Sequence, residues 1–179
     1  METARRAGAQ KQLRARLRQQ INWGRNALLA ILAITLLNQF MLMIGVNYHF
    51  LFSSAVPYYL NWLGRELAAH GDVTAFKVIA VVLTMVMYVA YIACWLLSSQ
   101  RREWLLAALG LYGIDTLLLV IFSLTLLENP ASCLLEILTH LVGLWLLYVA
   151  VGAANRLSSL PRPQRPSRTR ESGSEPAIN

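Results

Sequence analysis

Four long apolar stretches, separated by short hydrophilic segments, constrain this chain more than any other feature of its sequence. They cover residues 26–46, 76–97, 104–126 and 131–153. Each is long enough for one helix to cross a bilayer, which takes about 20 residues. Only 14% of the 179 residues are charged, and most of these lie in the two tails and one central turn. The sequence therefore predicts an all-α integral membrane protein with a bundle of four transmembrane helices.

The two tails are basic and hydrophilic. Residues 1–25 carry Leu13, Leu17 and Ile21 at helical spacing, which fits an amphipathic helix on an anionic membrane surface. A disordered tail that only carries positive charge is the equally supported alternative. Residues 155–179 are rich in Pro, Ser and Arg, and we expect them to be disordered. Both tails are expected to meet anionic lipid headgroups, and residues 26–154 form the transmembrane domain between them.

The segment at residues 47–75 lies between the first two spans and is too polar to cross the membrane. Pro57 is suited to the first turn of a helix, and Tyr58, Tyr59 and Trp62 are residue types that settle at the headgroup level. We therefore predict a short interfacial helix in the first outer loop, with a re-entrant segment as the alternative. Tyr58, Tyr59, Trp62 and Arg65 form a candidate outer-loop surface, for which membrane anchoring is favoured over ligand binding.

The distribution of Lys and Arg predicts the orientation of the spans. Seven lie in the N-terminal tail through Arg25, two in the turn between the second and third spans, and five in the C-terminal tail. The segments on the other side hold only Arg65 and Lys77. Because basic residues stay in the cytoplasm, we expect both termini inside. Arg outnumbers Lys by 14 to 2, which suggests a GC-rich bacterial genome and hence a multi-pass protein of the bacterial inner membrane.

Three ionisable residues fall within the expected spans. Asp115 lies near the middle of the third span, and His140 falls at a similar depth in the fourth at a rise of about 1.5 Å per residue. Glu136 lies four residues before His140, on the same helix face. We predict that Asp115 and His140 face each other inside the bundle. The whole candidate intramembrane polar cluster comprises Asn38, Gln39, Tyr88, Asp115, Glu136 and His140.

Such a cluster has several possible roles. Hydrogen bonding between helices is the commonest use of polar side chains in membrane bundles, and we favour it. A proton or ion pathway, a metal site and an acid–base pair are the alternatives. No metal-binding or protease spacing is present, so we predict no catalytic residue, no metal and no cofactor.

These observations indicate a small polytopic membrane protein that is not an enzyme and acts through interactions, as an accessory or assembly component. Its partners would be the bilayer and either another membrane protein or further copies of itself. A small oligomeric transporter or channel that uses the polar cluster is the first alternative, and an intramembrane lipid-modifying enzyme is the second. The net charge of +7 is explained by helix orientation, and no nucleic-acid recognition module is present.

Overall fold

The computed structural model describes residues 2–46, 50–70, 74–126 and 130–161, and the regular structure in these ranges is helical. The helices are α1 (Glu2–Met43), α2 (Ala55–His70), α3 (Thr74–Leu97), α4 (Glu103–Leu126) and α5 (Pro130–Ser159). Four of them are long and apolar enough to cross a membrane, over Gly8–Met43, Ala75–Leu97, Glu103–Leu124 and Leu134–Ser159. The prediction of an all-α protein with four spans and a short helix between the first two is confirmed.

The long helices extend beyond the expected spans into both tails. Helix α1 runs without a break through residue 25, so the described part of the N-terminal segment is helical and continuous with the first span. Helix α5 continues to Ser159, and the Arg14 side chain donates a hydrogen bond to the carbonyl of Pro161. Residues 155–159, which were expected to be disordered, are therefore helical, and residues 162–179 lie outside the described part.

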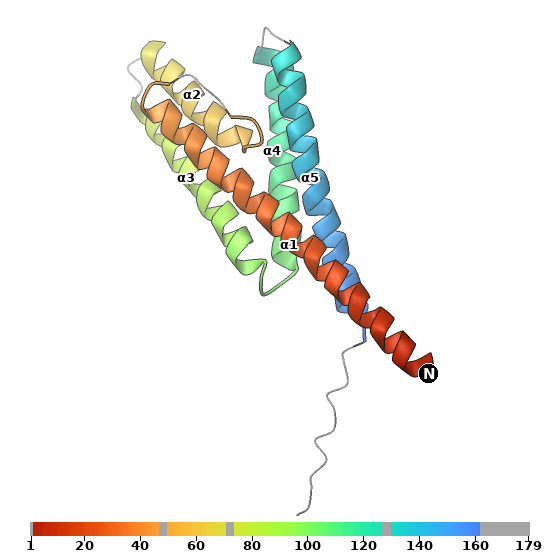
Figure 1. Ribbon diagram of the computed structural model, residues 1–179. Coiled ribbons are helices and arrows are strands. Elements are labelled where there is room, and N and C mark those ends of the chain that lie inside the picture. The colour runs from red at the N-terminus through yellow and green to blue at the C-terminus, as the bar shows by residue number, and fades with distance from the viewer. Residues whose placement is uncertain (1, 47–49, 71–73, 127–129, 162–179) are drawn as a thin grey trace, which may run out of the picture.

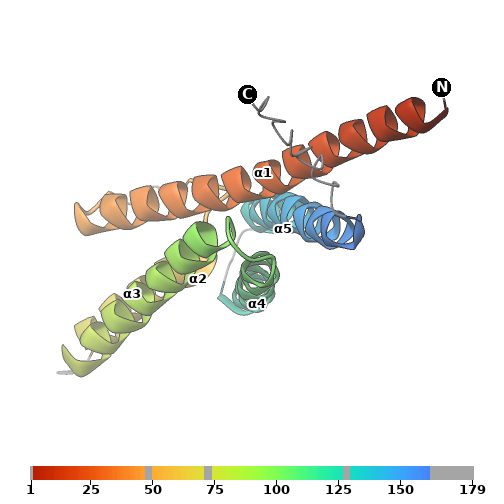
Figure 2. The same ribbon diagram turned by 90° about the horizontal axis from the view of Figure 1, so that it is seen from below.

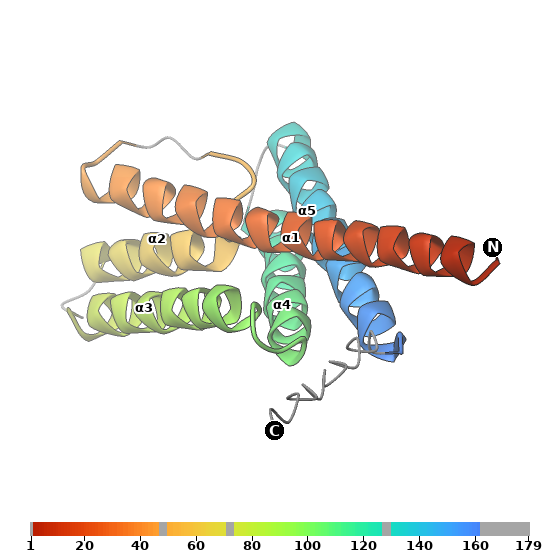
Figure 3. The ribbon, with the colours of Figure 1, turned by 60° about the horizontal axis from the view of Figure 1, so that its bottom comes forward.

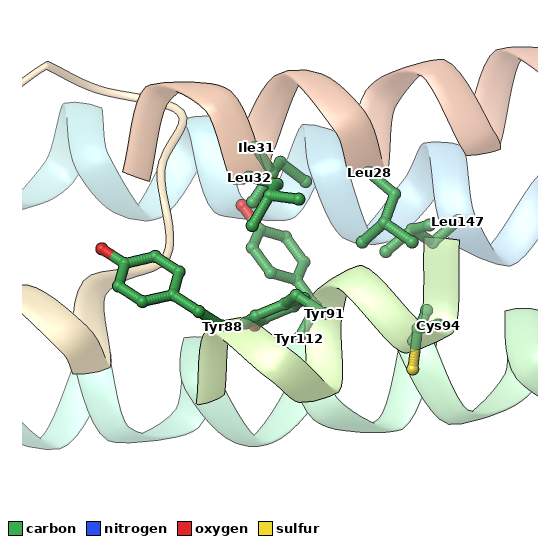
Figure 4. Packing of buried hydrophobic residues seen from close by; sticks show 9 residues of the cluster. Leu28, Ile31, Leu32, Tyr88, Tyr91, Cys94, Tyr112 and Leu147 are labelled. Atoms are coloured by element: carbon green, nitrogen blue, oxygen red, sulfur yellow. The ribbon is translucent and has the colours of Figure 1, made fainter. Parts of the chain in front are cut away.

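Helix α1 crosses over α5, and these two helices share the most extensive packing in the molecule (Figure 2). At the crossing, Gly24 lies directly against the Cβ atom of Ala150, so only a residue without a side chain fits there. Below it, Leu28, Ile31 and Leu147 pack with Tyr91 and Tyr112 in the buried core (Figure 4). Most exposed side chains on the spans are large and apolar, as expected where the surrounding solvent is lipid.

Helix α2 lies alongside α1 and α3 rather than across their ends (Figure 3). Its first turn meets Asp115 in the middle of α4, and Asn61 meets Thr84 in the body of α3. Gly64 allows this close approach, because a Cβ atom added there would lie 2.7 Å from that of Ala80. The short helix predicted between the first two spans is present, and it packs against α3, α4 and α1.

Candidate functional site

Asp115 occupies the centre of the bundle and is fully buried. Its Oδ1 atom accepts hydrogen bonds from the Ser54 hydroxyl at 2.8 Å and from the backbone N–H of Val56 at 2.9 Å. Its Oδ2 atom accepts from the backbone N–H of Ala55 at 3.1 Å and lies 3.3 Å from Nε2 of His140. Both carboxyl oxygens are therefore used by neighbouring groups.

This geometry makes Asp115 the N-terminal cap of α2, supplied by a different helix. The first N–H groups of any helix lack partners within the helix, and they form its positive end, where a carboxylate is favoured. At bilayer depth no water is present to satisfy them, and each unsatisfied group costs several kcal/mol. Asp115 thus allows a helix to begin inside the bundle.

His140 joins α5 to this cap. Its Nδ1 atom lies 3.0 Å from the backbone carbonyl oxygen of Glu136, and its Nε2 atom faces Asp115. A carbonyl oxygen only accepts, so Nδ1 must carry a hydrogen. One further proton is then needed for the 3.3 Å contact, either on the imidazole or on the carboxyl group. In both cases the pair has no net charge. The imidazole also stacks on Tyr112, with ring centres 5.2 Å apart.

Glu136 is buried and hydrogen bonds to the side chain of Tyr59 on α2. It therefore contacts the same helix as Asp115, one turn of α5 away from His140. Glu136, His140 and Asp115 do not converge on one point. Among the described residues, no group of three or more acidic, His or Cys side chains is placed to hold a metal ion.

Asn38 holds the segment that leads into α2, and Tyr88 packs nearby against α1. Both amide atoms of Asn38 bond the backbone of Phe50, each at 2.8 Å, and its nitrogen also donates to the Ser53 hydroxyl at 2.8 Å. The Tyr88 hydroxyl donates to the carbonyl of Thr35 at 3.2 Å. The bonds of Asn38 fix a segment in which Phe52 has a positive φ of 65°, a conformation that costs energy for a residue with a side chain.

Gln39 contacts α2 further along its length. Its Oε1 atom accepts a hydrogen bond from Asn61 at 3.0 Å, and Asn61 also donates to Thr84 at 2.8 Å. The six predicted residues therefore form two groups. Asp115, Glu136 and His140 meet the first turns of α2, whereas Asn38, Gln39 and Tyr88 hold the preceding segment, the body of α2 or the α1 backbone.

Sequence reasoning missed several residues of this arrangement. Ser54 immediately precedes α2 and donates to Asp115, and its N–H donates to the Thr35 hydroxyl at 2.7 Å. A Ser just before a helix is a recognised capping signal, so Ser54 could have been found from the sequence. Ser54 bonds the carboxylate and not the imidazole, which is unlike the nucleophile–base–acid order of a catalytic triad.

The four outer-loop residues do not form one surface. Tyr59 packs against Phe122 on α4, with ring centres 5.5 Å apart, whereas Arg65 donates to the carbonyl of Leu42 on α1 at 3.2 Å. Tyr58 lies edge-on to Tyr59, and Trp62 is exposed. Helix α2 thus directs these side chains toward different neighbours.

Comparison with protein-family models, with curated proteins and with solved structures gives no match for this chain. The fold and the site define its class, a small polytopic membrane protein with four candidate spans and a short helix between the first two that is capped by Asp115.

Proposed function

We propose that this protein is not an enzyme and acts in the membrane as an accessory or assembly component, through contact with another membrane protein or with further copies of itself. One observation carries the proposal. Asp115 and His140 have no exposed area, and their hydrogen bonds are made with α2 and with each other or the α5 backbone. Groups used in this way serve the scaffold and are not presented to a substrate.

Because the buried polar groups stabilise the fold, the outer surface of the bundle is the part available to bind a partner. Large apolar side chains such as Val89 on α3, Leu124 on α4 and Tyr148 on α5 are exposed along the spans. In a membrane, helices associate through packing and hydrogen bonds between such surfaces, so a partner helix can replace lipid on any of these faces.

We further propose that the protein lies in the bacterial inner membrane with both termini in the cytoplasm. The ends of α3 and α5 and the start of α4 lie together, and the opposite end of the bundle holds the start of α5 (Figure 1). The basic turn at Arg101 and Arg102 and the basic residue Arg156 thus share one end of the molecule, as the positive-inside rule requires.

Site-specific photocrosslinking in the native host tests the interaction. A photoreactive residue is placed at Val89, Leu124 or Tyr148, one per variant, on three different faces. We expect one face to give a single defined protein adduct and the other two to give only lipid adducts, because a specific partner covers one face. Adducts with lipid alone from every face of the bundle would contradict the proposal.

A proton carrier is the second candidate, favoured by the 3.3 Å contact between the Asp115 carboxyl group and the His140 imidazole in the centre of the bundle. A flux assay distinguishes the scaffold from the proton carrier. The purified protein is reconstituted in vesicles with an internal pH-sensitive dye. A scaffold leaves an imposed pH gradient intact. A pH gradient that collapses with the native chain and persists with Asp115→Asn would establish proton transport and contradict the scaffold proposal.

A further inference from the structure

A cavity of about 400 Å³ opens where α1, α2 and α3 meet, away from the Asp115 cap. Its polar lining is Gln39, Asn61 and Thr84, which hydrogen bond to one another through Asn61. Its apolar lining is Leu42, Met43, Val81 and Met85, and Arg65 and Lys77 complete it. The cavity is therefore amphipathic, with two cations and an apolar wall.

Within the described residues, no carboxylate compensates the positive charge of the cavity. No acidic residue is among its lining residues, and within the described residues neither Arg65 nor Lys77 pairs with a carboxylate. These are also the only Arg or Lys residues in the segment between residues 26 and 100. The fold thus brings together, in one cavity, the two basic residues that lie apart from the basic tails and the basic turn.

An apolar groove of about 330 Å³ continues from the cavity along α3. It is lined by Val81, Val82, Met85, Val86 and Val89, and it shares Val81 and Met85 with the cavity. From Lys77 to Val89 the helix rises roughly 18 Å at 1.5 Å per residue. A cationic site therefore leads into an apolar channel that follows the helix axis.

We propose that this cavity and groove bind one anionic phospholipid. The phosphate lies with Arg65 and Lys77, since both are donors that bind phosphate oxygens, and an acyl chain follows the groove along α3. The Gln39 amide nitrogen, which has no acceptor within the described residues, is available to an ester carbonyl. A zwitterionic lipid brings its own cation close to Arg65 and Lys77, so the site discriminates against it.

The test is native mass spectrometry of the full chain released from nanodiscs that contain equal amounts of phosphatidylglycerol and phosphatidylethanolamine. We expect the native chain to retain one phosphatidylglycerol. The double variant Arg65→Gln, Lys77→Gln should lower the retained ratio of phosphatidylglycerol to phosphatidylethanolamine by about tenfold, because two basic contacts to the phosphate are lost.

Two further variants separate this site from general attraction. Arg16→Gln, Arg18→Gln removes the same charge from exposed positions on α1 and should leave the ratio unchanged. Val81→Trp keeps both cations but fills the start of the groove, and it should abolish retention. Equal retention of the two lipids by the native chain would overturn the proposal, as would an unchanged ratio in the Arg65, Lys77 variant. Displacement of the lipid by inorganic phosphate alone would show that the site binds phosphate and not a lipid.

Discussion

Asp115 illustrates how one carboxyl group can make an otherwise costly backbone arrangement stable. Ala55 and Val56 present N–H groups in the middle of the bundle, and Asp115 accepts from both. His140 in turn occupies the remaining side of Oδ2. Loss of Asp115 removes the acceptor of both N–H groups and the partner of His140 Nε2, and the groups are therefore coupled through this carboxyl group.

A double-mutant cycle on Asp115→Asn and His140→Leu measures this coupling. The asparagine side chain keeps the shape of the cap, but its NH₂ group meets N–H donors and cannot accept from them. Each single change should destabilise the protein by about 1–3 kcal/mol, and the double change should cost at least about 0.5 kcal/mol less than their sum. Thermal unfolding in detergent gives the values.

Ser123→Ala is the control for this cycle, because the Ser123 hydroxyl is buried without a hydrogen-bond partner in the described part of the chain. Its loss removes no hydrogen bond, so the melting temperature should stay close to that of the native chain. Strictly additive effects of Asp115→Asn and His140→Leu would show that the contact between the two side chains contributes nothing.

At the scale of whole elements, the position of α2 depends on close packing as well as on its cap. Gly64 faces Ala80 of α3 at a distance that leaves no room for a methyl group. Rows of small residues allow helices in membranes to approach in this way, and Asn61 uses the short separation to reach Thr84 at 2.8 Å.

Gly64→Ala should therefore destabilise the protein by about 1–3 kcal/mol, since overpacked helices must move apart. The matched control is Gly110→Ala, where an added Cβ meets nothing within 4 Å; it should be neutral or stabilise by up to about 1 kcal/mol because Ala favours helix. Both melting temperatures are measured in the same detergent. Equal shifts for the two variants would mean that α2 and α3 are not tightly packed.

The four spans were predictable because hydropathy is a local property of the sequence, and the facing of Asp115 and His140 followed from their similar depth. The contacts of α2 were not predictable in the same way. Tyr58, Tyr59 and Trp62 are typical of the headgroup region, but no local pattern connects α2 to its cap Asp115, which lies 60 residues beyond Ala55. Likewise, Asn38 is visible as a polar residue in a span, but its backbone partner Phe50 is set only by the folded chain.

At the scale of the whole molecule, basic residues that lie far apart in the sequence are close together in the fold. The Arg102 side chain bonds to Ser158 at 2.8 Å, and Arg25 bonds to Ser98 at 3.1 Å. Basic residues of α1, of the turn after α3 and of the end of α5 are therefore gathered at one end of the bundle, the end that we assign to the cytoplasm.

Cysteine labelling tests that assignment in a background in which Cys94 and Cys133 are replaced by Ala. Glu66→Cys, at an exposed position of α2, should react in intact cells with a maleimide that does not cross membranes. Arg101→Cys and Arg156→Cys, which are also exposed, should react only after lysis. The reverse pattern would invert the topology, and labelling of Arg101→Cys and Arg156→Cys from opposite sides would exclude four spans.

The cap of α2 also has a consequence for the order of events during synthesis. The chain emerges from its N-terminus, so α2 is made before Asp115 and well before His140, which follows Asp115 by 25 residues. Until α4 has been inserted, the first N–H groups of α2 have no acceptor in the hydrocarbon and must remain in contact with water. Helix α2 therefore reaches its capped position only after α4 has been made, although α2 precedes both α3 and α4 in the chain.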